Sequence, residues 1–156
     1  MKKLTLLTTL ALAATSSAFA DNYIGGSIGS GATIHYQSDL SATSAVRYGL
    51  NLSFFGVSSS GLTLGGGVDY LNDVSGQSYG GLNPYYGFGL DAGVALGNAT
   101  GVSIYPHVLG GVSFDVSTPL SVFGELNAGP SITVGGGATG IGFGYGARIG
   151  LNYRLP

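Results

Sequence analysis

The sequence contains no cysteine and no tryptophan, and charged residues make up only 8% of it. Without cysteine, neither a disulfide framework nor a lipid anchor on an amino-terminal cysteine is available. Soluble domains usually carry about a quarter charged residues, so water is not expected to be the main solvent of this chain. Glycine, by contrast, supplies 30 of the 156 residues.

Basic residues are scarce beyond the first few positions. Lys2 and Lys3 are the only lysines, and the rest of the chain sets three arginines against seven carboxylates, a net charge of about −4. Because binding to phosphates needs clustered lysine and arginine, no nucleic-acid partner is expected.

The amino-terminal segment has the features of an export signal. The two lysines lead an apolar run over residues 4–14, which is followed by Ala18-Phe19-Ala20. This arrangement is typical of a secretory signal peptide with an A-x-A cleavage site. We therefore expect residues 1–20 to be a cleaved signal peptide and residues 21–156 to form a single domain, which fits the usual domain length.

Long apolar runs are also missing after residue 20. No segment there approaches the roughly 20 consecutive apolar residues that a membrane-spanning helix requires. A closed β-barrel is the other structure that satisfies every backbone group in lipid. A chain with this composition that lives in a membrane is therefore expected to be a barrel.

Apolar and polar residues alternate through most of the chain, which is the pattern of half-buried β-strands. The clearest example is the segment 142–155, where Phe143, Tyr145 and Ile149 interleave with glycine and arginine. The same alternation predicts further strands at 46–54, 62–70, 86–96, 102–116 and 120–128, with Leu109 and Phe123 off the pattern. A weaker, glycine-rich strand begins near Tyr23.

These segments give seven strands, whereas bacterial outer-membrane barrels have an even number, usually eight at this size. The missing strand fits either after a turn at Gly129-Pro130, as residues 131–137, or in a hairpin within residues 23–38. The first placement is favoured because it puts the longer loops 39–44 and 72–81 outside the cell, where long loops belong. Proline cannot donate to a ladder, so Pro106 and Pro130 are each expected to mark a bulge or a strand end.

Charged residues test the predicted strand faces, because they were not used to assign them. All seven on the predicted strands fall on the polar phase: Arg47, Asp69, Asp91, Asp115, Glu125, Arg148 and Arg154. In an eight-stranded barrel that phase faces a lumen just wide enough to be filled by side chains. We expect five of them to form an internal ion-pair network that plugs the lumen: Arg47, Asp69, Asp91, Glu125 and Arg148. A solute path lined by the same residues is the alternative.

Aromatic residues gather near the ends of several predicted strands. They are Tyr23, Phe54, Phe55, Tyr70, Tyr85, Tyr86, Phe114, Phe123 and Tyr153. Aromatic girdles at the two membrane interfaces have this distribution.

Few residues suggest chemistry. His107 could in principle act with Ser113 or Ser121 and Glu125 in nucleophilic hydrolysis, but with so many serines such a trio arises by chance. His35 and His107 are the only histidines and show no metal-ligand spacing. The glycines at 135–137 are followed by no lysine and no helix, as a phosphate loop would require. No enzymatic activity, metal or cofactor is therefore expected.

The final residues carry a likeness to a known family. The run Ile149-Gly-Leu-Asn-Tyr-Arg-Leu155 places an aromatic residue, Tyr153, two positions before a terminal leucine. In this the chain resembles the small eight-stranded outer-membrane barrels of the OmpA/OmpX type, and it departs from them at Leu155, in place of the usual phenylalanine, and at the extra Pro156. The resemblance implies an up-and-down antiparallel barrel in the outer membrane and contact with the barrel-assembly machinery during biogenesis.

Three functions remain open at this stage. The leading hypothesis is an all-β, integral outer-membrane barrel, expected to be a monomer in contact with outer-membrane lipid, with a structural or surface-interaction role. A narrow, porin-like channel for small solutes is the second. A soluble secreted β-barrel or sandwich that binds a ligand is the third, since alternation alone does not distinguish lipid from a second sheet packed on the apolar face.

Overall fold

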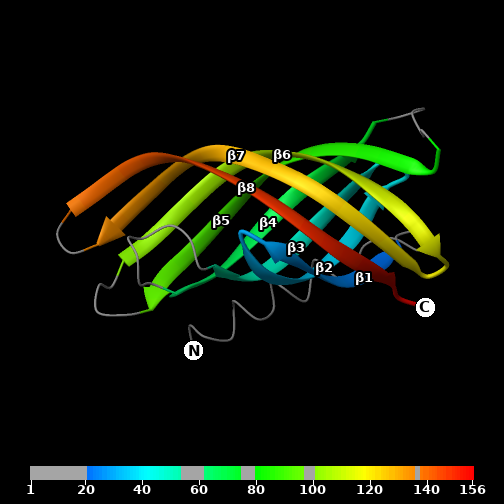
Figure 1. Cartoon of the computed structure of the whole chain (residues 1–156), viewed down its shortest axis with the longest axis horizontal. Coiled ribbons are helices and arrows are strands. Elements are labelled where there is room, and N and C mark those ends of the chain that lie inside the picture. Colours follow the sequence, from blue (N-terminus) through cyan, green and yellow to red (C-terminus); the bar gives the residue numbers. More distant parts are fainter. Residues whose placement is uncertain (1–20, 54–61, 75–79, 97–100, 136–137) are drawn as a thin grey trace.

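The computed structural model describes residues 21–53, 62–74, 80–96, 101–135 and 138–156. These residues form eight strands: β1 (Asn22–Gly29), β2 (Gly31–Ser41), β3 (Ser44–Ser53), β4 (Leu62–Asp73), β5 (Leu82–Leu96), β6 (Gly101–Ser117), β7 (Leu120–Gly135) and β8 (Ala138–Arg154). Each strand pairs antiparallel with the next, and β1 pairs with β8 to close the barrel (Figure 1). The predicted all-β, up-and-down barrel of eight strands is confirmed. Within the described residues no helix is long and apolar enough to cross a bilayer.

The favoured position of the eighth strand is wrong. β7 runs without a break from Leu120 to Gly135 and passes through Gly129-Pro130. The extra strand comes instead from the other alternative, since residues 22–41 form the β1–β2 hairpin around Ser30. Glycines on both faces of this hairpin weaken the apolar alternation that would have revealed it. As a consequence, the β2–β3 turn at residues 42–43 lies at the same end of the barrel as the two termini of the domain, and so do the end of β4 and the start of β5. Residues 75–79 of the expected loop 72–81 lie outside the described residues.

Pro106 and Pro130 lie inside strands, which corrects the expectation that each marks a bulge or a strand end. The β6–β7 pairing continues up to Ile104↔Ile132 and resumes at Val108↔Ala128. The two prolines fall opposite each other in the gap between these pairs. Neither has an N–H to donate, so the ladder is interrupted there, while each proline still has a register partner in its other neighbouring strand, β5 or β8.

The outer surface of the barrel is apolar. Large hydrophobic side chains such as Leu50, Phe88 and Ile149 are each more than 60% exposed. The residues between them in sequence point into the lumen, where Arg47, Asp69 and Glu125 are almost fully buried. This arrangement inverts that of a soluble protein and matches a barrel that is surrounded by lipid.

The two residues that broke the alternation lie on the lumen side. Leu109 and Phe123 are each 5% exposed, inside the barrel. Tyr85 also lies inside, as part of the same buried cluster, and Tyr23 lines a lumen cavity. The assignment of Tyr23, Tyr85 and Phe123 to an aromatic girdle is therefore wrong; Phe54 and Phe55 lie outside the described residues.

Connections at the end that holds the termini are tight where the structure describes them. β2 joins β3 through residues 42 and 43, and β6 joins β7 through Thr118 and Pro119. β5 is preceded by Gly80 and Gly81, whose φ angles are +62° and +87°. Only glycine adopts this left-handed conformation without strain, so these two residues fix the entry into β5.

Candidate functional site

Six ionisable side chains meet in the middle of the lumen, one from each of six successive strands. They are Arg47 from β3, Asp69 from β4, Asp91 from β5, His107 from β6, Glu125 from β7 and Arg148 from β8. Each lies on the inward phase of its strand, so the period-2 pattern alone directs all six toward the barrel axis.

Arg47 joins two carboxylates. Its Nη2 lies 2.8 Å from Asp69 Oδ2 and 2.7 Å from Glu125 Oε2, and its Nε donates to the same Asp69 oxygen at 3.1 Å. The guanidinium also lies over the Phe123 ring, 5.5 Å from its centroid. Arg47 is 3% exposed and the Glu125 side chain is fully buried. These are charge-assisted contacts in a site from which most water is excluded.

Arg148 bridges the same two carboxylates from the opposite side. Its Nε donates to Glu125 Oε1 at 2.6 Å, and its Nη2 donates to Asp69 Oδ2 at 3.0 Å. Glu125 Oε2 also accepts from the Tyr85 hydroxyl at 3.0 Å. Arg47, Asp69, Glu125 and Arg148 therefore form a closed ring of ion pairs across the lumen, and Tyr85 completes the coordination of Glu125.

His107 extends this network. Its Nε2 lies 3.1 Å from Asp69 Oδ1, and its Nδ1 lies 3.1 Å from the Tyr105 carbonyl oxygen. A carbonyl and an ionised carboxylate only accept hydrogen bonds, so the imidazolium form, which has two N–H donors, satisfies both contacts. With His107 charged, three cations balance three carboxylates in the lumen.

Asp91 belongs to the network more loosely. Its Oδ2 lies 3.8 Å from His107 Nδ1, and its Oδ1 accepts from Asn51 Nδ2 at 2.9 Å. The amide oxygen of Asn51 in turn accepts from the Thr33 hydroxyl at 2.8 Å. The Asp91 side chain is 30% exposed, so it forms the boundary between the network and an open part of the lumen.

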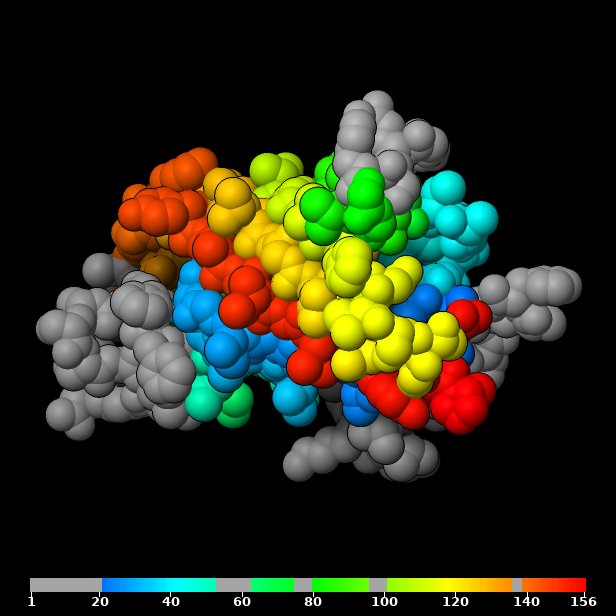
Figure 2. Space-filling model, turned by 45° about the vertical axis from the view of Figure 1, so that its right-hand side comes forward, coloured from blue at the N-terminus to red at the C-terminus, as the bar shows by residue number. Residues whose placement is uncertain are grey.

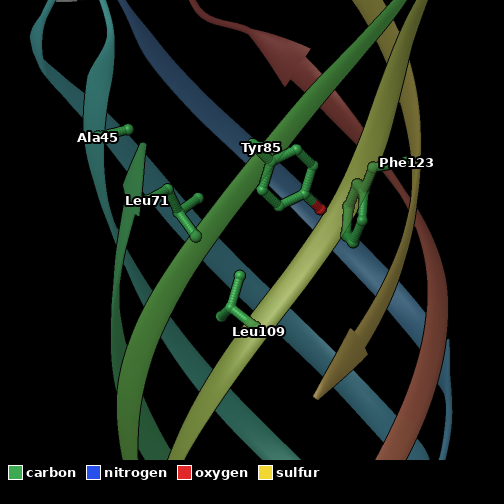
Figure 3. Close-up of a cluster of buried hydrophobic side chains, with 5 residues drawn as sticks. All are labelled: Ala45, Leu71, Tyr85, Leu109 and Phe123. Atoms are coloured by element: carbon green, nitrogen blue, oxygen red, sulfur yellow. The ribbon is translucent and has the colours of Figure 1, made fainter. Parts of the chain in front are cut away.

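A small apolar cluster lies beside the charges. Figure 3 shows the rings of Tyr85 and Phe123 next to each other, with Leu109 below them. Ala45 and Leu71 complete this buried cluster. In the described part of the chain every buried side-chain nitrogen or oxygen has a hydrogen-bond partner. Charges and cluster therefore lie together inside the barrel.

Cavities lie on both sides of this layer. One of about 230 Å³ is on the side of the termini and is lined by Arg47, Tyr85 and Phe123 among others. Another of about 420 Å³ is on the opposite side and is lined by Asp91, Tyr105 and Arg148 among others. The ring of ion pairs and the apolar cluster lie between these two cavities.

The candidate catalytic trio is not assembled. His107 contacts Asp69 and the Tyr105 carbonyl, whereas Glu125 is held by two arginines and Tyr85. Ser113 donates to the backbone oxygen of Asn83 at 3.4 Å. Among the described residues no group of three or more histidines and carboxylates is arranged to hold a metal ion.

Sequence analysis placed five of the six charged residues in this layer and missed the roles of His107 and Tyr85. His107 was on the inward phase, which was the available signal, but its contact with Asp69 depends on strand register. Arg154, also on the inward phase, lies outside the layer and pairs with Asp21 near the chain termini. Asp115 lines the smaller cavity and does not reach the ring.

Glycine at position 89 makes room for the network. A Cβ there would overlap Asp69 Oδ1 and lie 2.7 Å from His107 Nε2. We expect Gly89→Ala to displace the Asp69–His107 pair and lower the free energy of unfolding by about 1 to 3 kcal/mol, as overpacking does. Gly124, on the outer face, has no atom within 4 Å of such a Cβ, so Gly124→Ala is the matched control and should be close to neutral. Urea unfolding in lipid vesicles measures both; equal stability of the two variants would contradict the packing described here.

An eight-stranded barrel with an apolar exterior and a polar lumen is typical of one class of protein, the small outer-membrane barrels. No family model matches the sequence, and no curated protein matches it. Solved structures do match. A major outer membrane protein from Thermus thermophilus aligns with a TM-score of 0.52 at 13% identity, covering 88% of this chain and all of that one. The N-terminal β-barrel domain of Pseudomonas aeruginosa OprF aligns with a TM-score of 0.56 at 12% identity, covering 87% and 96%. The chain therefore has the fold of these outer-membrane barrels.

Proposed function

We propose that this chain is an integral outer-membrane protein whose barrel is closed by side chains and whose role is structural or one of surface interaction. Residues 1–20 direct its export, and the assembly machinery for outer-membrane barrels inserts it. The mature barrel is a monomer in contact with outer-membrane lipid. It carries no cofactor and catalyses no reaction.

One observation supports this proposal: Arg47, Asp69, Glu125 and Arg148 form a ring of ion pairs inside the lumen, beside the buried rings of Tyr85 and Phe123. A channel needs a hydrated path with unpaired polar groups, whereas here two arginines and two carboxylates satisfy one another. Transport of small solutes is the second candidate, because chambers of about 230 and 420 Å³ lie on either side of the layer. That function would require the ring of ion pairs to open.

The orientation of the barrel follows from its even number of strands. Both ends of the domain lie on one side, and a signal peptide delivers the chain to the periplasm. If both ends stay in the periplasm during insertion, only the hairpins between strands have to cross the membrane. The β2–β3 turn and the end of β4 are then periplasmic, the reverse of the first expectation for these segments.

Single-cysteine labelling tests location and orientation together, since the chain has no native cysteine. Thr139 lies at the far end of β8, and Thr43 in the β2–β3 turn; both are exposed. We expect a membrane-impermeant maleimide to label Thr139→Cys on intact cells and Thr43→Cys only after the outer membrane is disrupted.

Folding of both variants is verified by gel mobility with and without boiling, because folded barrels migrate anomalously. Labelling of Thr43→Cys alone on intact cells would reverse the orientation. Recovery of both variants in the soluble fraction would contradict the membrane location itself.

A further inference from the structure

The larger lumen cavity, of about 420 Å³, lies on the side of the ion pairs opposite the termini, and we call it the far chamber. Residues 143–148 of β8 line part of it, so it lies toward the orange end of β8 in Figure 2, away from the red carboxyl terminus. Small-molecule sites usually enclose roughly 300 to 1,000 Å³, and the far chamber falls within that range. Apart from two charged residues, the side chains that the strands direct into it carry hydroxyl or amide groups: Thr33, Asn51, Thr63, Ser103, Tyr105, Asn127, Ser131 and Thr133.

The two charged residues of the far chamber differ in how fully they are paired. Arg148 donates to Glu125 Oε1 at 2.6 Å and to Asp69 Oδ2 at 3.0 Å, so its charge belongs to the ring of ion pairs. Asp91 Oδ1 accepts from Asn51 Nδ2 at 2.9 Å, whereas its Oδ2 accepts no hydrogen bond from the described residues. The far chamber is therefore lined by one carboxylate oxygen with free acceptor capacity.

His107 does not fill that capacity. Its Nδ1 lies 3.8 Å from Asp91 Oδ2, which is too far for a hydrogen bond, and lies 3.1 Å from the Tyr105 carbonyl oxygen instead. The Tyr105 ring is stacked on the imidazole, with the centroids 5.0 Å apart and the planes at 18°. Tyr105 lines the far chamber and His107 does not. A molecule in the chamber therefore meets the Asp91 carboxylate and an aromatic ring.

The Asp91 carboxylate is held in place before any ligand arrives. The Asn51 amide that donates to it is itself fixed by the Thr33 hydroxyl, which donates to Asn51 Oδ1 at 2.8 Å. Gly67 is the register partner of Asp91 on β4, and a Cβ there would overlap Asp91 Oδ1. Because the acceptor is already positioned, little conformational freedom is lost when a ligand binds to it.

Space for a ligand lies next to this carboxylate. Gly93 is the next inward position on β5, between the side chains of Thr63 on β4 and Ser103 on β6. A Cβ at residue 93 would lie 2.7 Å from Thr63 Cγ2 and 3.3 Å from Ser103 Oγ. Glycine at this position leaves the two hydroxyl side chains close to the chamber, where their oxygens can accept further hydrogen bonds.

This combination of groups favours a ligand with a positive charge and several hydrogen-bond donors. A primary ammonium group has three donors and no acceptor, and it is attracted both by a carboxylate and by the face of an aromatic ring. An anion would be repelled by Asp91, and a neutral ligand would leave its charge unpaired. Among the described residues no cluster of ligands is arranged to hold a metal ion, so an organic cation fits better than a metal.

We propose that the far chamber is a binding site for a small organic molecule that carries a primary ammonium group. Asp91 Oδ2 accepts a hydrogen bond from the ammonium, the hydroxyl groups of Thr63 and Ser103 accept others, and the rest of the ligand lies along the polar wall. The site gives the surface-interaction role a ligand class. Entry of the ligand from outside the cell rests on the orientation proposed above.

Titration of the purified barrel in lipid nanodiscs, followed by NMR, tests the ligand class. The probe is 4-amino-1-butanol, and its control is 1,4-butanediol, in which a hydroxyl replaces the ammonium. We expect the probe to shift the side-chain amide signals of Asn51 and to bind at least tenfold more tightly than the diol, because hydrogen bonds to charged groups are the stronger ones. Equal binding of the two compounds, or no shift of the Asn51 amide, would overturn the proposal.

Two matched variants test the role of Asp91. Asp91→Asn removes the charge and keeps the size of the side chain, so we expect it to bind 4-amino-1-butanol at least tenfold more weakly than the wild-type barrel. Asp115→Asn removes the same charge from the smaller cavity and should bind like the wild type. Unchanged affinity of the Asp91→Asn variant would contradict the proposal, as would an equal loss in both variants.

Folding of both variants is verified by gel mobility with and without boiling, and the comparison of the two probes on the wild-type barrel needs no variant. These measurements use purified, folded protein, so they do not depend on where the barrel lies in the cell. The cysteine labelling tests location and orientation separately. A barrel that is labelled as expected but binds the diol as tightly as the amine would exclude the ammonium site and leave the proposed function intact.

Discussion

Replacing Arg47 by alanine is expected to lower the free energy of unfolding by about 3 to 5 kcal/mol, the usual effect of removing one partner of a buried ion pair. Arg47 is 3% exposed and touches Asp69 and Glu125. Its loss leaves those carboxylates sharing Arg148 and His107 and makes the layer net negative. Urea unfolding in lipid vesicles measures the change.

Two controls isolate the network. Arg154 pairs with Asp21 at the solvent-exposed rim, with 46% and 38% of the side chains exposed, so Arg154→Ala should change stability little. Adding Glu125→Gln to Arg47→Ala restores equal numbers of positive and negative charges. The double variant should therefore lose less stability than the two single variants together. An Arg47→Ala variant as stable as wild type would mean that water already fills the layer.

The loss of stability caused by an arginine on the outer face of β8 is expected to depend on how deep in the membrane the position lies. Ile149 lies beside the charged layer, 65% exposed on the outer face, and Ile149→Arg is expected to reduce stability by about 2 to 4 kcal/mol near the bilayer midplane. Ile141 lies eight residues away on the same face. There, the same substitution should lower stability by about 0 to 1 kcal/mol, because β8 has by then reached the membrane interface.

Unfolding in vesicles of a lipid with a defined thickness compares the two variants directly. A soluble barrel would show similar, small effects at both positions, since both side chains would already face water. Equal losses of stability at the two positions would therefore argue against a lipid-facing outer surface. A larger loss at Ile141 than at Ile149 would mean that the membrane-embedded part of the barrel lies closer to the β7–β8 end.

Period-2 alternation was enough to predict the class of fold, because in a barrel it reports which face of each strand meets lipid. It could not reveal the β1–β2 hairpin. The turn there is a single residue, Ser30, and glycines remove the contrast between the two faces. Pro130 was also wrongly expected to mark a bulge or a strand end. A proline has no N–H to donate, but it can remain within a strand when the residue opposite it, here Pro106, has none either.

The sequence indicates which charged residues face the lumen, but it does not indicate which of them contact one another. Phase alone places Arg47, Asp69, Glu125 and Arg148 inside the barrel. Which of them meet depends on a stagger that accumulates over eight strands, and no local pattern encodes that. Leu109 and Phe123 broke the alternation because the lumen of so narrow a barrel also needs apolar side chains to fill it.

Planar-bilayer recording of the purified, folded protein tests the central claim most directly, namely that side chains close the lumen. The charged layer and its apolar cluster leave chambers of about 230 and 420 Å³ on either side of the layer. We expect no steady conductance from the wild-type barrel, because its central arginines and carboxylates neutralise one another. Stable, ion-selective open channels in the wild-type protein would contradict the account and favour transport.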